Sequence, residues 1–258
     1  MDLNLINQAR ELIAPALSPG ELARIDAIDR QEHVPDDCDV SLGDLAMMID
    51  HTLLRADATP GEVERLCEEA VAWKVGAVCV NSWLVPTAQA VLAGTPVKIA
   101  SVVGFPLGAC ASRIKADETG WAVNHGADEI DMVINLGALK ARNWRLVVDD
   151  IMAVRESAPP PGVLKVILEM VRLTHEEKIL AALLSVAAGA DFVKTSTGFD
   201  RGGANVEDVR LLRDAVGWNL GVKAAGGIHS RVDAINMVRA GANRIGASRT
   251  SDILSERS

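Results

Sequence analysis

The sequence predicts an α/β fold, a (β/α)8 TIM barrel of eight parallel strands with an N-terminal helical extension. Three observations support this prediction. Short apolar runs alternate with amphipathic stretches along most of the 258 residues. A Gly-Ala pair precedes several of the runs, and a capping residue with an acid three positions later starts several of the stretches. Eight such units in a chain of this length are typical of a closed parallel barrel.

The first 44 residues are predicted to form the helical extension, and residues 45–258 the barrel catalytic domain. Apolar residues recur at helical spacing near the start and favour an amphipathic helix lying on the barrel: Leu3, Ile6, Ile13 and Ala16. The segment also carries Asp2 and Glu11 and has no cationic start or continuous apolar core. We therefore do not expect a secretory signal.

Eight apolar runs are the predicted strands. In chain order they are residues 47–51, 77–81, 98–104, 129–135, 163–169, 191–196, 220–226 and 243–248. Gly-Ala pairs precede four of these runs, and glycine suits the left-handed position that ends a helix. The runs are apolar enough to be buried on both faces, as parallel strands are.

Helices are predicted between the strands. Thr59-Pro60-Gly61-Glu62 is a capping box with proline at the first helical position. The same spacing recurs in Thr174 with Glu177, Asn205 with Asp208 and Ser230 with Asp233. An open doubly wound sheet is the alternative fold, but it usually has a Gly-rich turn after its first strand. HTLLRADAT follows the first strand here, which favours the barrel.

Composition excludes several classes of partner. The net charge is -9 and no basic run occurs, so nucleic acid is not expected. No apolar run has the roughly 18 residues that span a membrane. The cysteines form no CxxC pair or metal-ligand spacing, so we expect no metal, and free thiols in the cytoplasm: Cys38, Cys67, Cys79 and Cys110.

Charged residues lie near the carboxyl ends of five predicted strands: Asp50, Asp131, Lys165, Lys194 and Lys223. In a parallel barrel these strand ends face the catalytic mouth. An isolated buried ion loses many kcal/mol of hydration. Three cations and two anions directed into one cavity would offset one another, which indicates a functional site.

Lys194 follows Phe192 and Val193, which are predicted to be buried. A structural interpretation is that its amine reaches the surface or joins a core ion network. We favour a nucleophilic amine, because lysine is a poor residue for a purely structural buried site. Such an amine must be neutral, and both burial and a neighbouring cation lower the pKa of lysine from about 10.4.

Lys223 supplies the neighbouring cation, near the end of the next predicted strand. Adjacent strands are about 4.8 Å apart, so two inward lysines at matching height would repel until one loses its proton. Pairing of Lys223 with a carboxylate, without a chemical role, is the alternative.

Asp131 is the favoured acid/base because it is nearer the carboxyl end of its strand than Glu129, which shares its parity. Glu129 is then expected only to balance charge inside the barrel. For Asp50 and Lys165 a structural ion pair and a substrate contact are equally favoured.

Glycines in the loops after the last three strands indicate an anion site. They are Gly198, then Gly226 and Gly227, then Gly246, which is followed by Ala247 and Ser248. In barrels, the loops after strands 7 and 8 often bind phosphate through backbone N–H groups. Glycines that only make tight turns are the alternative interpretation.

Four segments together resemble the deoxyribose-phosphate aldolases, a family of class I aldolases with a (β/α)8 barrel. They are SVVGFPLGA, GADEIDMVINLGALK, DFVKTSTGF and GVKAAGGI, and the resemblance extends from about Met48 to Ser248. It implies reversible cleavage of 2-deoxy-D-ribose 5-phosphate to acetaldehyde and D-glyceraldehyde 3-phosphate, without a cofactor.

The resemblance also implies roles for individual residues. Lys194 matches the Schiff-base lysine, Lys223 the second lysine and Asp131 the proton-shuttling aspartate. The implied substrate pocket is Asp50, Thr52, Cys79, Lys165 and Thr197. The implied phosphate-binding residues are Gly198, Gly226, Gly227, Gly246 and Ser248. A homo-oligomer, a dimer or a tetramer, is expected because barrels of this kind often pair through their helices.

The sequence departs from the family pattern in four places. It contains no tyrosine, whereas some members use a C-terminal tyrosine in proton transfer. Arg249, His229 and the pair Met170-Val171 also stand where other residues are common. Two alternatives remain open: another Schiff-base barrel acting on a keto acid or sugar phosphate, and a catalytically inactive barrel with a binding role.

Overall fold

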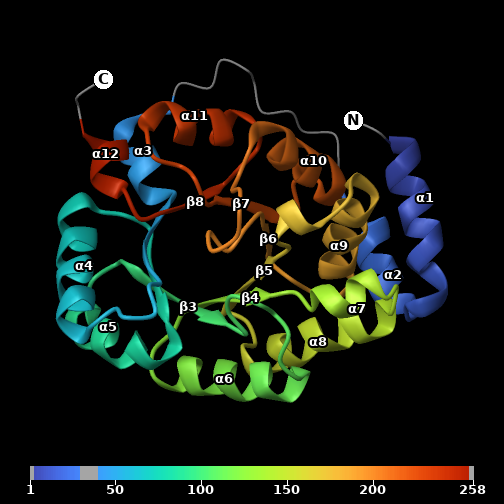
Figure 1. The fold of residues 1–258 in the computed structure, drawn as a ribbon, viewed down its shortest axis with the longest axis horizontal. Helices are drawn as coiled ribbons and strands as arrows, with labels where there is room; N and C mark the ends of the chain where they lie inside the picture. The colour runs from blue at the N-terminus through green and yellow to red at the C-terminus, as the bar shows by residue number, and fades with distance from the viewer. Residues whose placement is uncertain (1–2, 30–39, 256–258) are drawn as a thin grey trace.

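The computed structural model describes residues 3–29 and 40–255. Eight parallel strands close into a barrel in which each strand pairs with the next one in the sequence and β8 pairs with β1 (Figure 1). The strands are β1 (Ile49–Leu53), β2 (Ala77–Asn81), β3 (Lys98–Val103), β4 (Glu129–Val133), β5 (Val163–Ile167), β6 (Phe192–Lys194), β7 (Gly221–Ala225) and β8 (Arg244–Ala247). The predicted TIM barrel is confirmed.

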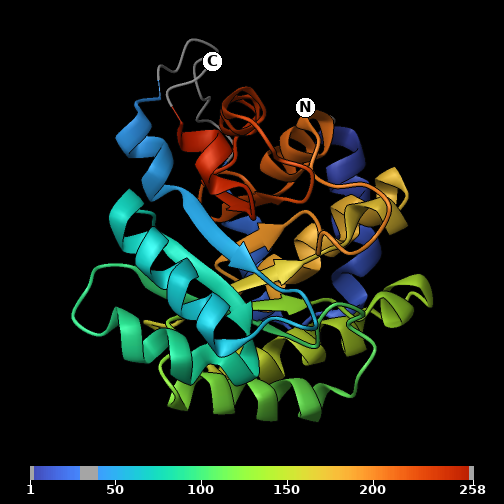
Figure 2. The same ribbon diagram turned by 60° about the vertical axis from the view of Figure 1, so that its left-hand side comes forward.

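Helices surround the strands as an outer ring, which Figure 1 shows down the barrel and Figure 2 from a turned view. The longer ones are α4 (Pro60–Trp73), α5 (Val85–Leu92), α6 (Ser112–Asn124), α8 (Trp144–Ser157), α9 (His175–Ala187), α10 (Val206–Val216) and α11 (Arg231–Arg239). Shorter segments are α3 (Leu42–Met47), η2 (Ser82–Leu84), α7 (Leu136–Lys140), η3 (Met170–Arg172) and α12 (Thr250–Leu254). No helix among the described residues is long and apolar enough to cross a membrane.

The start of the first strand was predicted wrongly. β1 begins at Ile49 rather than at residue 47, because Met47 is the last residue of α3 and is 59% exposed. Ser41 caps that helix by accepting a hydrogen bond from the Asp44 N–H at 3.1 Å. The predicted runs for β4, β5 and β6 extend two residues too far, since these strands end at Val133, Ile167 and Lys194.

The predicted helix starts are confirmed by their hydrogen bonds. Thr174 and Glu177 form a reciprocal capping box at α9, with N···O distances of 2.8 and 3.3 Å. Ser230 and Asp233 form the same box at α11, and Thr59 and Glu62 form it at α4. Asn205 caps α10 by accepting from the Asp208 N–H at 2.8 Å. These side chains satisfy N–H groups that a helix start leaves without partners.

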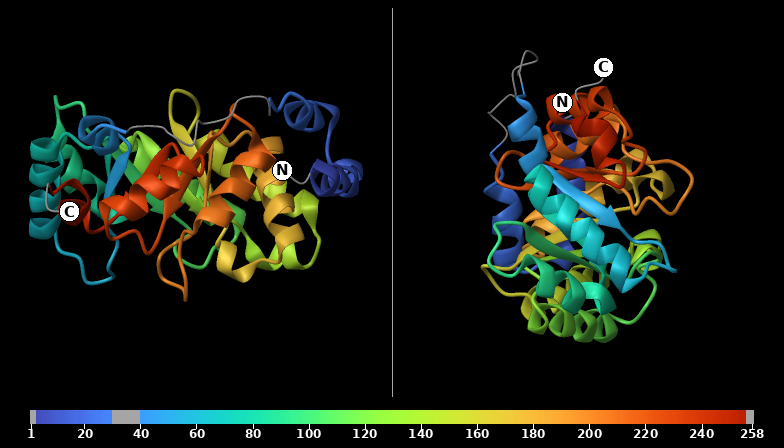
Figure 3. Two further views of the ribbon diagram at one scale, coloured as in Figure 1. Left: turned by 90° about the horizontal axis from the view of Figure 1, so that it is seen from above. Right: turned by 90° about the vertical axis from the view of Figure 1, so that its left-hand side faces the viewer.

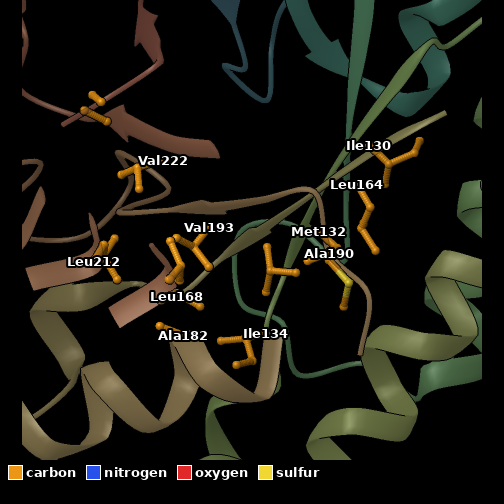
Figure 4. Packing of buried hydrophobic residues seen from close by; sticks show 14 of the residues in the cluster. Ile130, Met132, Ile134, Leu164, Leu168, Ala182, Ala190, Val193, Leu212 and Val222 are labelled. Atoms are coloured by element: carbon orange, nitrogen blue, oxygen red, sulfur yellow. The ribbon is translucent and has the colours of Figure 1, made fainter. Parts of the chain in front are cut away.

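Helix α9 is buried all round from Ile179 to Ala187 because it is covered on two sides. Figure 4 shows Ile134, Leu168 and Val193 beside Ala182 on its barrel side. Helices α1 (Leu3–Ile13) and α2 (Pro19–Asp26), separated by η1 (Ala14–Ala16), pack on α9 from outside. Figures 1 and 3 show them at the edge of the barrel opposite α4. The N-terminal segment is therefore an added layer on one side of the ring.

Apolar side chains hold this layer in place. Ile6, Ala9 and Ile13 of α1 and Ile25 of α2 are buried, whereas Leu3 is half exposed. Full burial of one isoleucine stabilises the fold by roughly 1.5–3 kcal/mol. A hydrogen bond also ties this layer to α9. The Arg24 guanidinium donates to the carbonyl of Ala187, the last residue of α9, at 2.7 Å.

A buried ion pair joins α6 to α8. The Lys115 Nζ lies 2.5 Å from Asp150 Oδ2, and both side chains are fully buried. The same amine donates to the Val133 carbonyl at the end of β4, at 2.9 Å. Removing one member of such a pair leaves the other as an uncompensated buried charge.

We therefore expect Asp150→Ala to lower the free energy of unfolding by about 3–5 kcal/mol. The matched control is Asp117→Ala, which breaks the exposed Arg113–Asp117 pair of α6 and should leave stability nearly unchanged. Urea denaturation followed by circular dichroism measures both. Equal stabilities of the two variants would contradict this account of the pair.

Candidate active site

Lys194 is the last residue of β6, and its side chain is only 3% exposed. It lines a cavity of about 620 Å³ at the carboxyl ends of the strands. Phe192 comes two residues earlier and packs against Gly221 of β7, where a Cβ atom would lie 2.0 Å from the phenyl ring. The alternation of side chains along a strand thus puts the amine one layer above an aromatic side chain.

Asp131 connects three lysines. Its Oδ2 accepts hydrogen bonds from Lys194 Nζ and Lys223 Nζ, each at 2.7 Å. Its Oδ1 accepts from Lys165 Nζ, also at 2.7 Å. Lys194 and Lys223 are register partners on neighbouring strands, as their spacing in the sequence predicts. The carboxylate therefore links β4, β5, β6 and β7 inside the barrel.

A second set of ion pairs lies around this carboxylate. Lys223 also donates to Asp50 Oδ2, and Lys165 Nζ lies 2.5 Å from Glu129 Oε2. Arg244 of β8 donates to Glu129 Oε1, and its Nε lies 3.3 Å from Asp50 Oδ1. Arg244 is not among the predicted site residues. The sequence could have indicated Arg244 through its position two residues before Gly246, on the same face of the predicted strand.

The pKa directions differ among the three amines. Burial lowers the pKa of Lys194, the Lys223 charge lowers it further, and Asp131 only partly opposes them. For Lys223, burial also acts to lower the pKa, but Asp131 and Asp50 outweigh it and the pKa is raised. The pKa of Lys165 is raised in the same way, with burial opposed by Asp131 and Glu129. The amine whose pKa is lowered is therefore the one that lines the cavity.

Burial lowers the pKa of Lys194 more than the crowding of two ammonium groups does. The sequence argument rests on repulsion between Lys194 and Lys223, yet the largest cause of the lowered Lys194 pKa is desolvation. Burial alone would raise the pKa of Asp131, but its three lysine neighbours hold that pKa well below the usual value. A neutral amine can still donate a hydrogen bond to this carboxylate.

The predicted pocket residues divide into two groups. Thr52 and Thr197 line the cavity. Asp50, Cys79 and Lys165 are fully buried and lie outside the cavity lining. This burial favours the ion-pair interpretation of Asp50 and Lys165 over direct substrate contact. Burial also raises the pKa of the Cys79 thiol, which is therefore uncharged at neutral pH.

All five predicted phosphate-binding residues line the same cavity as Lys194: Gly198, Gly226, Gly227, Gly246 and Ser248. Gly226 and Gly227 have φ values of +88° and +75°, a region that side chains rarely adopt. A Cβ atom at Gly226 would lie 3.1 Å from the Gly203 Cα. Glycine is therefore required there both by conformation and by space, and it leaves the backbone open toward the cavity.

Glu169 follows the carboxyl end of β5, is buried, and is not among the predicted site residues. Its Oε2 accepts hydrogen bonds from the Thr197 N–H at 3.3 Å and from the Thr197 hydroxyl. The hydroxyl in turn accepts from the Phe199 N–H at 3.1 Å. Glu169 thus holds the loop after β6 in one conformation. The available sequence signal was an acid at the end of the predicted strand 163–169, after the apolar residues Val166, Ile167 and Leu168.

The remaining sequence departures also have definite positions. His229 lines the cavity next to the Gly226-Gly227 turn, whereas Arg249 is exposed and lies outside the lining. Met170 is buried and Val171 is half exposed in η3. Among residues 3–29 and 40–255 no three His, Cys, Asp or Glu side chains gather in a way that could hold a metal, and Cys38 lies outside the described residues.

Comparison with known proteins identifies the family. A family model described as "DeoC/LacD family aldolase" matches residues 45–251. The chain belongs to this aldolase family. It is therefore an aldolase, a carbon–carbon lyase. The matched residues include every strand of the barrel and leave α1 and α2 outside.

Individual relatives agree with this assignment. The chain is 53% identical over 212 residues to the deoxyribose-phosphate aldolase of Carboxydothermus hydrogenoformans, covering 81% of this chain and 93% of that one. It is 55% identical over 212 residues to the same enzyme of Aciduliprofundum boonei, covering 82% and 96%. The solved tetrameric structure of deoxyribose phosphate aldolase from Aeropyrum pernix is 34% identical, with a TM-score of 0.77 over 83% of this chain and 91% of that one.

We expect Lys223→Leu to raise the pH at which Lys194 reacts with an aldehyde. The change removes the neighbouring cation and leaves Asp131 with one fewer ammonium partner, and both effects favour the protonated form of Lys194. The rate of aldehyde adduct formation on Lys194 across a pH series measures the shift, with circular dichroism to check the fold. An unchanged pH profile would count against any influence of Lys223.

Proposed function

We propose that this aldolase is a deoxyribose-phosphate aldolase that acts through a Schiff base on Lys194. It reversibly cleaves 2-deoxy-D-ribose 5-phosphate into D-glyceraldehyde 3-phosphate and acetaldehyde. The observation that carries this proposal is the Lys194 amine, which has a lowered pKa and lies in one cavity with three glycine-containing loops. The names of relatives at 53% and 55% identity support the choice of substrate.

Binding begins at the rim of the cavity. The loops with Gly198, Gly226 and Gly227, together with Ser248, hold the phosphate, because open backbone N–H groups suit an anion. The aldehyde end of the sugar then extends down to Lys194. This arrangement places C1 of the substrate next to the neutral amine, so binding of a remote group positions the reacting carbon.

The covalent step begins when the Lys194 amine attacks C1 and the carbinolamine loses water to form a protonated imine. The imine accepts the electron pair of the C2–C3 bond as that bond breaks, and the 3-hydroxyl loses its proton to become the aldehyde of glyceraldehyde 3-phosphate. The resulting enamine takes a proton at C2. Hydrolysis of the new imine releases acetaldehyde and restores the amine.

Asp131 is the group that moves protons in these steps, because its carboxylate lies 2.7 Å from the Lys194 amine. A water molecule carries the protons between this carboxylate and the reacting atoms. Lys223 stays protonated and stabilises the carboxylate between them. The chain contains no tyrosine, so no tyrosine takes part when the enamine is protonated. Asp131 and water carry out that transfer in this proposal.

The protein is further proposed to act as a homo-oligomer, a dimer or a tetramer, in the cytoplasm. The relative from Aeropyrum pernix is described as tetrameric, which supports an assembly of this kind. The cysteines within the described ranges, Cys67, Cys79 and Cys110, are free thiols. Free thiols are typical of a reducing compartment.

Reductive trapping tests the proposal. Acetaldehyde with borohydride should leave a reduced two-carbon adduct on Lys194, read by peptide mapping. Lys194→Met should lower the rate of deoxyribose 5-phosphate cleavage at least about a thousandfold. The matched control is Lys98→Met, an exposed lysine at the start of β3, which should keep both adduct and activity.

Other outcomes favour the alternatives. An adduct formed with pyruvate in preference to acetaldehyde would indicate a Schiff-base aldolase that acts on keto acids. An adduct only on Lys165 or Lys223 would overturn the role of Lys194. No adduct with any carbonyl donor would support an inactive barrel.

A further inference from the structure

Arg244 lies within the ion network but outside the cavity. It is the first residue of β8 and the register partner of Lys223. Its side chain is 15% exposed, bonds Glu129 and lies near Asp50. It does not line the cavity that holds Lys194, so it has no route to the substrate.

The charges inside the barrel do not balance while every group is ionised. Among the described strands the network contains four cations, Lys165, Lys194, Lys223 and Arg244, and three carboxylates, Asp50, Glu129 and Asp131. Without Arg244 the three amines and three carboxylates would be equal in number, and every lysine could keep its proton. Arg244 therefore adds one surplus positive charge.

A surplus charge in a buried network is costly, and one lost proton removes it. Arginine does not lose its proton in proteins, so an amine must. Lys223 contacts both Asp50 and Asp131, and Lys165 contacts both Glu129 and Asp131. Lys194 contacts Asp131 alone among the described carboxylates. It is therefore the amine whose proton is held least strongly.

The remaining strands, β2 and β3, add no charge to the buried network, because the charged residue of β3, Lys98, is exposed and pairs with Asp128. Cys79 of β2 faces the network, and burial raises the pKa of its thiol, so it does not act as a fourth anion. The inward residues of β3 beside it are the apolar Ala100 and Val102. The charge balance is thus decided by groups on β1, β4, β5, β6, β7 and β8.

We propose that Arg244 is a positioning residue whose surplus charge, acting through Asp50 and Glu129, keeps Lys194 neutral and nucleophilic. This inference deepens the proposed function and rests on Lys194 as the imine-forming residue. It assigns control of the Lys194 charge to Arg244, a residue that touches neither the substrate nor the reacting amine.

Four variants test the proposal. Arg244→Met removes the surplus cation, and Glu129→Gln removes one carboxylate and so increases the surplus. The double variant carries both changes and restores a surplus of one. Arg244→Lys keeps the charge but alters the geometry. The measurement is the pH at which cyanoborohydride trapping of acetaldehyde on Lys194 reaches half its maximal rate, read by mass spectrometry.

The two single changes should move this pH in opposite directions. For Arg244→Met we expect an increase of about one pH unit, and for Glu129→Gln a decrease of about one unit, as for one charge near a buried group. The double variant and Arg244→Lys should both return close to the unchanged protein. A merely structural role would lower the trapping rate in all four variants without moving the half-maximal pH in opposite directions.

The outcomes also separate this inference from the proposed function. If the unchanged protein forms no adduct on Lys194, the proposed function fails. If the adduct forms and the half-maximal pH stays the same in folded Arg244→Met and Glu129→Gln, the role of Arg244 is overturned. Should Arg244→Met fail to fold, the decrease expected for Glu129→Gln and its reversal by a second charge-removing change, Lys165→Met, decide the question.

Discussion

The carboxylate of Asp131 is the interaction on which the site depends. Three ammonium or amine groups from three neighbouring strands share its two oxygens at 2.7 Å. Each of these groups would be costly to bury alone, and the shared contact offsets that cost only while all partners are present. The same contact orients the Lys194 amine and holds its ammonium neighbour beside it. The packing of the site and the proposed reactivity of Lys194 thus both depend on one carboxylate.

The barrel makes this arrangement possible through its register. Side chains alternate along each strand, so Phe192 and Lys194 occupy successive layers of the interior, and Lys223 lies beside Lys194 on the next strand. The layer that holds the ions lies below the glycine loops that line the cavity. Groups on rigid strands keep their positions better than groups on loops, which suits the proposed attack of one amine on one carbon.

The outer layers have a separate task. Helix α9 is covered by the barrel on one side and by α1 and α2 on the other, which explains why every one of its residues from Ile179 to Ala187 is buried. The residues matched by the aldolase family begin at 45, after these two helices. The ion network around Asp131 and the N-terminal layer therefore lie in different parts of the molecule, joined by the apolar core around α9.

Local patterns in the sequence were sufficient for most of the fold. Capping pairs such as Thr174 with Glu177 and apolar runs of strand length depend on residues close together in the chain, so the eight strands and their helices follow directly. The pairing of Lys194 with Lys223 was also predictable, because consecutive strands of a parallel barrel are neighbours. The start of β1 was not, since the Met47-Met48 pair suits either a strand or the end of a helix.

The partners of the charged residues were decided only by the tertiary structure. Arg244 meets Glu129 across the barrel, and Glu169 meets Thr197 between two loops, at sequence separations that no local pattern encodes. Which lysine has a lowered pKa depends on burial and on the number of carboxylates around each amine, and both are properties of the closed barrel. The sequence alone determined which groups point inward, and closure of the ring determined which of them touch.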